Sequence, residues 1–214
     1  YGGFFDVMLA AELDVDGMEA VAAATAAAGT WNVPTQTLIE NRLTGIGIDE
    51  LESRPDIQYM PKQTVDRWAA ATEALRAESG FDSDVAQLAI AIRRSLILAL
   101  HRAGARLLLG SDAPQVFNVP GFSVHHELDL LVAAGLTPFE ALATGTTAPA
   151  EFLGTNAGIV QNGKDADLIL LDANPLEDIS NSRRIHGVML RGNWLSSRDL
   201  EERMARFIDN TASP

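Results

Sequence analysis

The chain has 214 residues, 47% of them hydrophobic, which is enough to bury the core of one large domain or of one large and one small domain. Its 16 basic and 29 acidic residues give a formal net charge of −13. This balance argues against a nucleic-acid partner, because nucleic-acid-binding proteins concentrate lysine and arginine. The absence of cysteine excludes disulfides, thiolate metal ligands and a cysteine nucleophile.

The sequence shows no pattern for membrane insertion or export. No run approaches the roughly 18 apolar residues of a membrane span, and Tyr1-Gly2-Gly3 lacks the basic-then-apolar pattern of a signal peptide. A soluble, cytoplasmic protein is favoured, with the compartment left open. The chain also starts without methionine and in mid-pattern, as a fragment would.

Helical patterns dominate the first hundred residues. An alanine-rich helix is expected from Asp14 to Gly29, with Asp14 or Asp16 as its N-cap and Gly29 ending it in the left-handed conformation. Residues 30–38 predict a short strand that runs into a loop, with Pro34 at the strand's end or edge, and residues 41–61 predict a functional lid or an irregular excursion. Two helices should follow, over 62–79 and 82–103. The second has an apolar stripe of Val85, Leu88, Ala89, Ile92, Leu96 and Leu100.

The order helix, strand, polar loop, helix then recurs. Residues 106–109 predict a strand buried on both faces, residues 123–134 predict a helix ending at Gly135, and Thr137-Pro138 with Glu140 forms a capping box. This order is typical of βα units around a parallel sheet or barrel. After Gly154 we expect two short strands within 158–171, a hairpin over 185–195 turning at Arg191-Gly192, and a last helix from Ser197 or Asp199 to about Asp209.

Asp112 is the sharpest chemical signal in the sequence. It follows the predicted strand over 106–109, and the loops at the carboxyl ends of parallel strands are where α/β folds place reactive groups. The alternative from position alone is a helix-capping turn formed by Ser111 and Asp112 before Ala113-Pro114.

A series of motifs decides between these alternatives. In order and spacing it resembles the end of the amidohydrolase superfamily, closest to the branch of imidazolonepropionases and Xaa-Pro dipeptidases. The similarity is strongest over residues 107–195. The motifs are Gly110-Ser111-Asp112-Ala113-Pro114, Gly135 to Leu142, Thr146 to Ala150, Leu153-Gly154, Gly158, Gly163 to Leu168 and Asn174-Pro175-Leu176.

The resemblance implies an α/β fold in which a (β/α)8 TIM-like barrel holds one or two divalent metals, typically zinc. The family's metal ligands are a His-x-His pair, a bridging group, two further histidines and an aspartate after the last strand. Only the aspartate matches here, at Asp112. The resemblance therefore implies that Asp112 is both a metal ligand and the catalytic group that takes a proton from the metal-bound water and passes it to the leaving amine.

The four histidines do not supply the missing ligands. Neighbours on a helix point about 100° apart, so His125 and His126 do not form a self-contained metal site with Glu127. His125, His126 and Asn118 are weaker candidates for substrate binding, against an interpretation as loop packing and helix capping. His101 is expected at a helix end and His186 at the surface. Lys164, Asp165 and Asp167 are expected to be structural.

The sequence therefore predicts the last strands and helices of a barrel over residues 1–154, part of a small flanking β-sandwich over 155–196, and a C-terminal helix and tail over 197–214. Its function is predicted as part of a metal-dependent hydrolase of C–N bonds in an amide, a cyclic amide or a dipeptide-like substrate, inactive alone. Its partners would be that small molecule, the remainder of the barrel and, as a further option, a second copy. The alternative is a non-catalytic domain that binds a partner or ligand with a degenerate half-barrel.

Overall fold

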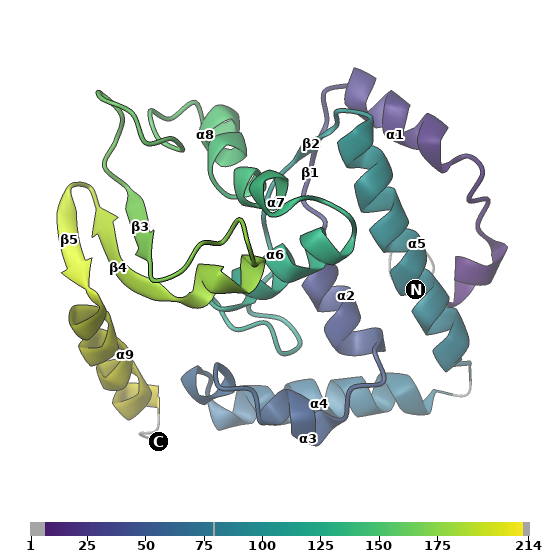
Figure 1. Cartoon of the computed structure of the whole chain (residues 1–214). Coiled ribbons are helices and arrows are strands. Elements are labelled where there is room, and N and C mark those ends of the chain that lie inside the picture. Colours follow the sequence, from purple (N-terminus) through teal and green to yellow (C-terminus); the bar gives the residue numbers. More distant parts are fainter. Residues whose placement is uncertain (1–6, 79, 212–214) are drawn as a thin grey trace.

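The computed structural model describes residues 7–78 and 80–211. Figure 1 shows a larger helical region and, beside it, a small antiparallel sheet that leads into the C-terminal helix. Two short parallel strands lie inside the helical region. Among the described residues, no helix combines the length and the apolar character needed to cross a membrane.

The first helices follow the predicted pattern closely. A 3-10 helix η1 (Val7–Glu12) precedes α1 (Met18–Ala27), and Gly29 ends this region with φ +66° as expected. The N-cap of α1 is Gly17, so the prediction of Asp14 or Asp16 was wrong. Asp14 instead accepts a hydrogen bond from the Asp16 backbone N–H, which stabilises the turn before the helix.

Residues 30–38 were predicted as a short strand that runs into a loop; the short strand is confirmed, but the expected loop is wrong from Gln36 onward, where a helix begins. The strand β1 is only Trp31–Asn32, Thr35 has φ +48°, and helix α2 (Gln36–Leu43) begins directly after it. The predicted excursion over 41–61 also contains ordered elements, α3 (Ile48–Glu52) and the 3-10 helix η2 (Ile57–Tyr59). Leu51 and Ile57 bury these turns against α4, so tertiary burial outweighs the local Gly and Pro signals.

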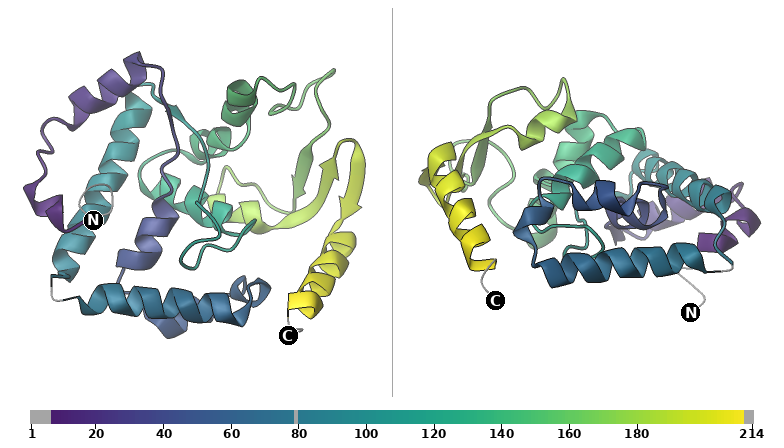
Figure 2. Two further views of the ribbon diagram at one scale, coloured as in Figure 1. Left: turned by 180° about the vertical axis from the view of Figure 1, so that it is seen from behind. Right: turned by 90° about the horizontal axis from the view of Figure 1, so that it is seen from below.

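Two long helices enclose this part of the molecule. Helix α4 (Lys62–Ala77) lies across one end of it, as Figure 2 shows, and the predicted end at Ser79 lies outside the described residues. Helix α5 (Ser83–Arg102) is capped by Asp82, whose carboxylate accepts from two backbone N–H groups. Its buried face differs from the predicted stripe, since Leu88 is 42% exposed, and consists of Ala86, Ala89, Ile90, Ile97 and Leu100.

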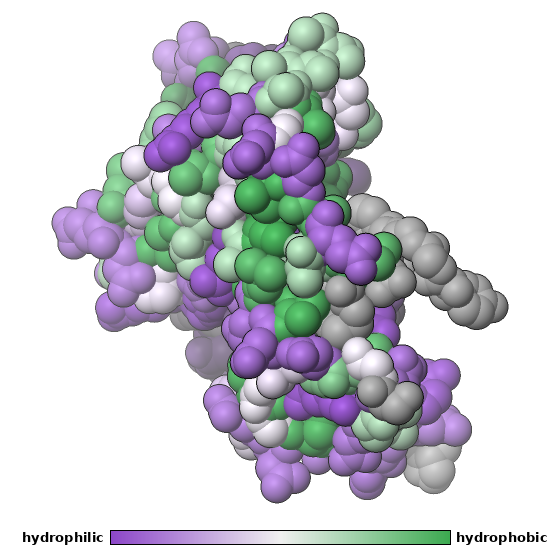
Figure 3. Space-filling model, turned by 90° about the vertical axis from the view of Figure 1, so that its right-hand side faces the viewer, coloured by the Kyte–Doolittle hydropathy of each residue, from purple (hydrophilic) through white to green (hydrophobic). Residues whose placement is uncertain are grey.

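The small residues explain the shifted face of α5. Ala86 and Ala89 pack in one cluster with Ala10 of η1 and with Ile39 and Leu43 of α2. The elements η1 and α2 therefore pack against α5 where its side chains are short. The bulky residues used for the prediction lie partly beside this contact. On the side that carries α1 and α5, apolar side chains form a band between hydrophilic borders (Figure 3).

Strand β2 (Arg106–Leu107) pairs in parallel with β1, with Trp31 opposite Arg106 and Asn32 opposite Leu107. Three helices follow: α6 (Ser123–Ala133), α7 (Pro138–Thr144) with the predicted capping box at Thr137 and Glu140, and α8 (Thr147–Leu153). Leu107, Leu128 and Leu131 join residues of α5 in the main apolar cluster. The order of elements is that of the predicted βα units.

The C-terminal sheet has the order β3-β4-β5 and is antiparallel, with β3 (Leu168–Leu171), β4 (Ile185–Leu190) and β5 (Asn193–Ser196). The 3-10 helix η3 (Ile179–Arg183) precedes β4, and the turn at Arg191-Gly192 has positive φ at both residues, as the predicted hairpin requires. The predicted strand before β3 is absent among the described residues. Gly158 lies against α8, where an added Cβ would be 2.7 Å from Thr146 O.

Helix α9 (Ser197–Thr211) ends the described chain. Its N-cap is Ser196, whereas Ser197 or Asp199 was predicted. Asp199 Oδ2 accepts from the backbone N–H of Ser196 at 2.9 Å, and Ser196 Oγ accepts in turn from the Asp199 N–H at 3.3 Å. This reciprocal pair is a capping box centred on Ser196.

Candidate active site

Contacts with β1 and the segment after it hold the residues that lead from β2 to Asp112. The Leu108 N–H donates to Asn32 O at 2.8 Å, which extends the pairing of β1 and β2 by one bond. At Gly110 an added Cβ would lie 2.6 Å from Cγ1 of the exposed Val33 side chain, so any larger residue here would displace that side chain. Asp112 thus lies just beyond the carboxyl end of β2, where the sequence places it.

The side chain of Asp112 is exposed at the surface. Its backbone has φ +56°, a left-handed conformation that non-glycine residues adopt uncommonly. Gln115 Nε2 donates a hydrogen bond of 2.8 Å to Asp112 Oδ2. A carboxylate in this position can accept a proton from a molecule arriving from solvent.

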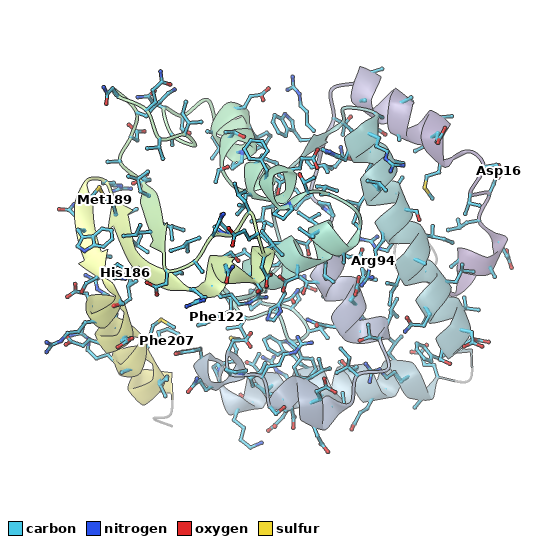
Figure 4. The ribbon with its side chains drawn as sticks, viewed as in Figure 1. Asp16, Arg94, Phe122, His186, Met189 and Phe207 are labelled. Atoms are coloured by element: carbon cyan, nitrogen blue, oxygen red, sulfur yellow. The ribbon has the colours of Figure 1, made fainter. Side chains whose placement is uncertain are left out.

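The loop from Ser111 to Phe122 is fixed to its surroundings at several points. Ser111 Oγ and Ser123 Oγ, both buried, are 2.7 Å apart and share a hydrogen bond. Phe122, labelled in Figure 4, stacks on Tyr59 of η2 with ring centroids 4.9 Å apart. Phe117 is fully buried and packs beside Trp68 of α4. The loop is therefore packed into the protein, although Asp112, Pro114 and Gln115 are exposed.

Asn118 is the polar centre of this loop, and it is fully buried. Its Nδ2 donates to Ser111 O at 2.6 Å, and its Oδ1 accepts from Thr37 Oγ1 at 3.2 Å and from Asn41 Nδ2 at 2.9 Å. Asn41 Nδ2 also donates to Val116 O at 3.1 Å. Helix α2 is thereby joined to Val116 and Asn118, and through Asn118 to the Ser111 carbonyl that precedes Asp112.

Glu127 on α6 holds the first turn of α2. Its Oε1 accepts from the backbone N–H of Gln36 at 2.9 Å and its Oε2 from that of Thr37 at 2.8 Å. The side chain is fully buried, and this burial raises the pKa of Glu127 to about 7, although the two backbone hydrogen bonds and nearby Arg93 act in the opposite direction. These N–H groups would otherwise be unpaired at the helix start.

Two arginines of α5 complete this polar layer. Arg93 donates to Gln36 Oε1 at 3.0 Å and to Pro34 O at 2.7 Å. Arg94, labelled in Figure 4, makes a two-pronged ion pair with Glu40 of α2, with contacts of 2.8 and 2.5 Å. Gln36 also donates to Glu40, so α2 is bonded to α5 and α6 through charged and amide groups.

The adjacent histidines have partners of their own. His125 Nδ1 lies 2.9 Å from Ser182 Oγ of η3, and His126 Nδ1 lies 3.4 Å from a guanidinium nitrogen of Arg183. His126 Nε2 is 4.0 Å from Asp56 Oδ2, a buried oxygen without a hydrogen-bond partner among the described residues. Burial, followed by Arg183, lowers the pKa of both imidazoles. The described hydrogen bonds therefore tie the two histidines to η3 and not to Asp112.

The remaining sequence candidates take the places expected of structural residues. Asp167 Oδ1 accepts from the Arg191 backbone N–H at 2.6 Å, which joins β3 to the hairpin turn. His101 contacts Glu140 at 3.0 Å at the end of α5, and exposed His186 contacts Asp172 at 2.9 Å. Sequence reasoning did not identify Glu127 as a buried anchor. Its spacing of four residues from both Ser123 and Leu131, which are buried, is the signal that could have done so.

No group of three or more His, Asp or Glu side chains able to hold a metal ion occurs among the described residues. An open apolar cavity of about 740 Å³ lies between α6, α7 and α8 on one side and β3 and β4 on the other, with His125 in its lining. Asp112 does not line it, so the apolar space and the exposed carboxylate are separate features. Asp112 alone does not fit a metal site with three protein ligands.

Comparison with known proteins supplies the family. The Amidohydrolase family matches residues 14–195. A search of curated proteins found no match. Among solved structures, the chain is similar to a bottromycin amidohydrolase, with a TM-score of 0.71 and 24% identity over 99% of this chain and 48% of that one.

Two further structures share the fold. A Xaa-Pro dipeptidase with bound methionine in its active site has a TM-score of 0.55 and 19% identity, over 87% of this chain and 38% of that one. A protein described as an amidohydrolase has a TM-score of 0.53 and 22% identity, over 83% and 37%. The chain spans half or less of the length of each. The mixed α/β structure, the ordered motifs around Asp112 and the match over residues 14–195 show that the chain belongs to the amidohydrolase family, whose fold is of the TIM-barrel type.

Proposed function

We propose that this chain is the Asp112-bearing part of a hydrolase that cleaves a C–N bond in an amide, a cyclic amide or a dipeptide-like small molecule. The observation that carries the proposal is the position of Asp112: an exposed carboxylate five residues beyond the carboxyl end of the parallel strand β2, in a loop anchored from α2 and α6. Loops at this end of α/β barrels carry the reactive groups.

In the proposed reaction, Asp112 handles the proton. A water oxygen attacks the carbonyl carbon while an Asp112 oxygen accepts a proton from that water, and the same proton passes to the nitrogen as the C–N bond breaks. The products are a carboxylic acid and an amine. Gln115, which donates to Asp112 Oδ2, orients the carboxylate and leaves Oδ1 for the proton.

A divalent metal, with zinc as the first choice, is part of this proposal for the whole enzyme. Asp112 would supply one ligand, and the others would come from outside the described residues, because those residues hold no further cluster. The corresponding fold proposal is that residues 1–154 form part of a barrel, 155–196 part of a β-sandwich and 197–214 a C-terminal helix and tail. The rest of the barrel is then the first partner, and His125 and His126 remain candidates for substrate contact.

The test is a hydrolysis assay on the protein that carries this chain, using N-acyl amino acids, cyclic amides and dipeptides ending in proline, with zinc or manganese added. Asp112→Asn keeps the shape but removes the proton acceptor, so turnover should fall by at least about a hundredfold. Asp172→Asn, at an exposed residue directly after β3, is the matched control and should have no effect on turnover. Normal turnover in Asp112→Asn would exclude Asp112 as the catalytic group, and an inactive wild-type protein would favour the non-catalytic domain.

A further inference from the structure

The segment that begins at Asp112 has an unfavourable backbone. Three of its non-glycine residues have positive φ: Asp112 at +56°, Val116 at +25° and Phe117 at +60°. For residues with a Cβ, and above all for a β-branched valine, this region is sterically disfavoured. A chain in such a conformation persists only where the surrounding structure holds it. The contacts that hold it therefore determine where the Asp112 carboxylate points.

Asn118 makes a buried contact with the residue that precedes Asp112. Its 2.6 Å hydrogen bond goes to the carbonyl of Ser111, which belongs to the peptide unit that leads into Asp112. The backbone N–H of Asn118 also donates to Gln115 O at 2.7 Å, so both its side chain and its main chain close the turn. Gln115 is the residue that donates to the Asp112 carboxylate.

The amide oxygen of Asn118 faces the other way, into α2. There it accepts from both Thr37 and Asn41, and Asn41 in turn accepts from Arg54 at 2.9 Å. Since Asn118 has no exposed surface, no solvent can replace a lost partner. A substrate arriving from solvent has no exposed Asn118 atom to contact.

We propose that Asn118 is a positioning residue for Asp112, which fixes the peptide between Ser111 and Asp112 against α2. This positioning role rests on the proposed function, because the orientation of the Asp112 carboxylate matters for turnover only if Asp112 takes part in the reaction. It replaces the substrate contact expected for Asn118 from the sequence. Helix α2 thereby becomes part of the support of the candidate site, although its own residues are not the reacting groups.

The first test uses Asn118→Asp in the 214-residue chain. This change keeps the side-chain size and the acceptor contacts with Thr37 and Asn41 but removes the N–H donor to Ser111 O. Amide hydrogen exchange of residues 111–118, measured by mass spectrometry, should become at least about tenfold faster, with α5 unchanged. Asn162→Asp makes the same chemical change at an exposed residue and is the control. Exchange at the wild-type rate in folded Asn118→Asp would overturn the proposal.

A second readout separates positioning from general packing. Lowering the pH from about 7 to about 5 protonates a buried introduced carboxyl, which then regains a donor for Ser111 O. The ratio of the mutant to the wild-type exchange rate should therefore fall with pH. If circular dichroism shows that Asn118→Asp is unfolded, Thr37→Val decides instead. It removes one donor to Asn118 Oδ1 and should speed exchange of residues 111–118 about threefold, whereas unchanged exchange would overturn the proposal.

The hydrolysis assay distinguishes this proposal from the proposed function. If Asp112→Asn abolishes turnover, Asn118→Asp should lower kcat at least about tenfold and leave KM within about twofold, because substrate binding is retained. Faster loop exchange with an unchanged kcat would then exclude a positioning role. If Asp112→Asn has no effect on turnover, the proposed function fails, while the exchange experiment still decides whether Asn118 holds the loop.

Discussion

The carboxylate of Glu127 accepts a hydrogen bond of 2.9 Å from the backbone N–H of Gln36, 91 residues earlier in the chain. The contact caps α2 with a carboxyl group supplied by α6, a helix that begins directly after the Asp112 loop. Because α2 also holds Asn118, the carboxylates of Glu127 and Asp112 are connected through one short helix.

We predict that Glu127→Gln destabilises the chain by about 1–3 kcal/mol near pH 5. Glutamine has the same shape but can accept at only one of its two terminal atoms, so a buried N–H at the start of α2 loses its partner. Urea unfolding followed by circular dichroism measures the change. Glu177→Gln, at an exposed position, is the control, and equal stability of wild type and Glu127→Gln would contradict the capping role.

Titration of Glu127 should contribute to the pH dependence of the free energy of unfolding. Its pKa is raised to about 7 in the folded chain, above the unfolded value of about 4.3, so folding takes up a proton between these values. The stabilisation linked to this proton uptake is fully present below about pH 4.3 and is lost as the pH rises through about 7. The loss is on the order of 3 kcal/mol.

The histidines act in the opposite direction. The lowered pKa of His125 and of His126 makes stability fall as the pH drops below about 6.5. The wild-type curve alone therefore mixes the two effects. The difference between wild type and Glu127→Gln, measured from pH 5 to pH 8, isolates the glutamate and should shrink as the pH rises. A constant difference would show that Glu127 does not titrate in this range.

The 214-residue chain alone should not bind zinc tightly. Asp112 offers one carboxylate, and coordination by three protein ligands supplies most of the affinity of a zinc site. Isothermal titration calorimetry should give a Kd weaker than about 10 µM, that is, a binding free energy smaller than about 7 kcal/mol. Stoichiometric submicromolar zinc in the purified chain would refute this prediction.

The chain alone should also associate through its small sheet. Ile169 on the edge strand β3 is 61% exposed, and Leu190 and Trp194 of the neighbouring strands are also exposed. Unpaired edge strands with apolar side chains promote association. Light scattering after size exclusion should show Ile169→Lys to be more monomeric than wild type. Leu88→Lys on α5 is the matched control. A wild-type chain that is monomeric at all concentrations would refute the prediction.

Local sequence signals were sufficient to predict caps and turns that depend only on neighbouring residues. The capping box at Thr137 and the turn at Arg191-Gly192 are short-range features, and the structure contains both. Asp112 was placed correctly beyond β2 because the apolar run and the polar loop are adjacent in sequence. Its catalytic and metal-binding roles remain predictions.

Long-range contacts explain the failures. Residues 36–43 form a helix because Glu127, Arg93 and Arg94 satisfy the polar groups of its first turns from 54 to 91 residues away. Such partners cannot be identified from the β-branched residues of the segment itself. The same holds for Leu88, whose exposure depends on which helices cover α5.

The pairing of Trp31 with Arg106 has a consequence for the order of folding. The two-residue parallel ladder joins parts of the chain that are separated by the whole of α2 to α5. The loop formed by this segment must therefore close before the ladder gains any hydrogen bond. The hairpin of β4 and β5, by contrast, needs only a two-residue turn and can form within microseconds. The loop with Asp112 depends on the late ladder and on α2. We therefore expect this loop to acquire its native order among the last parts of the chain during refolding.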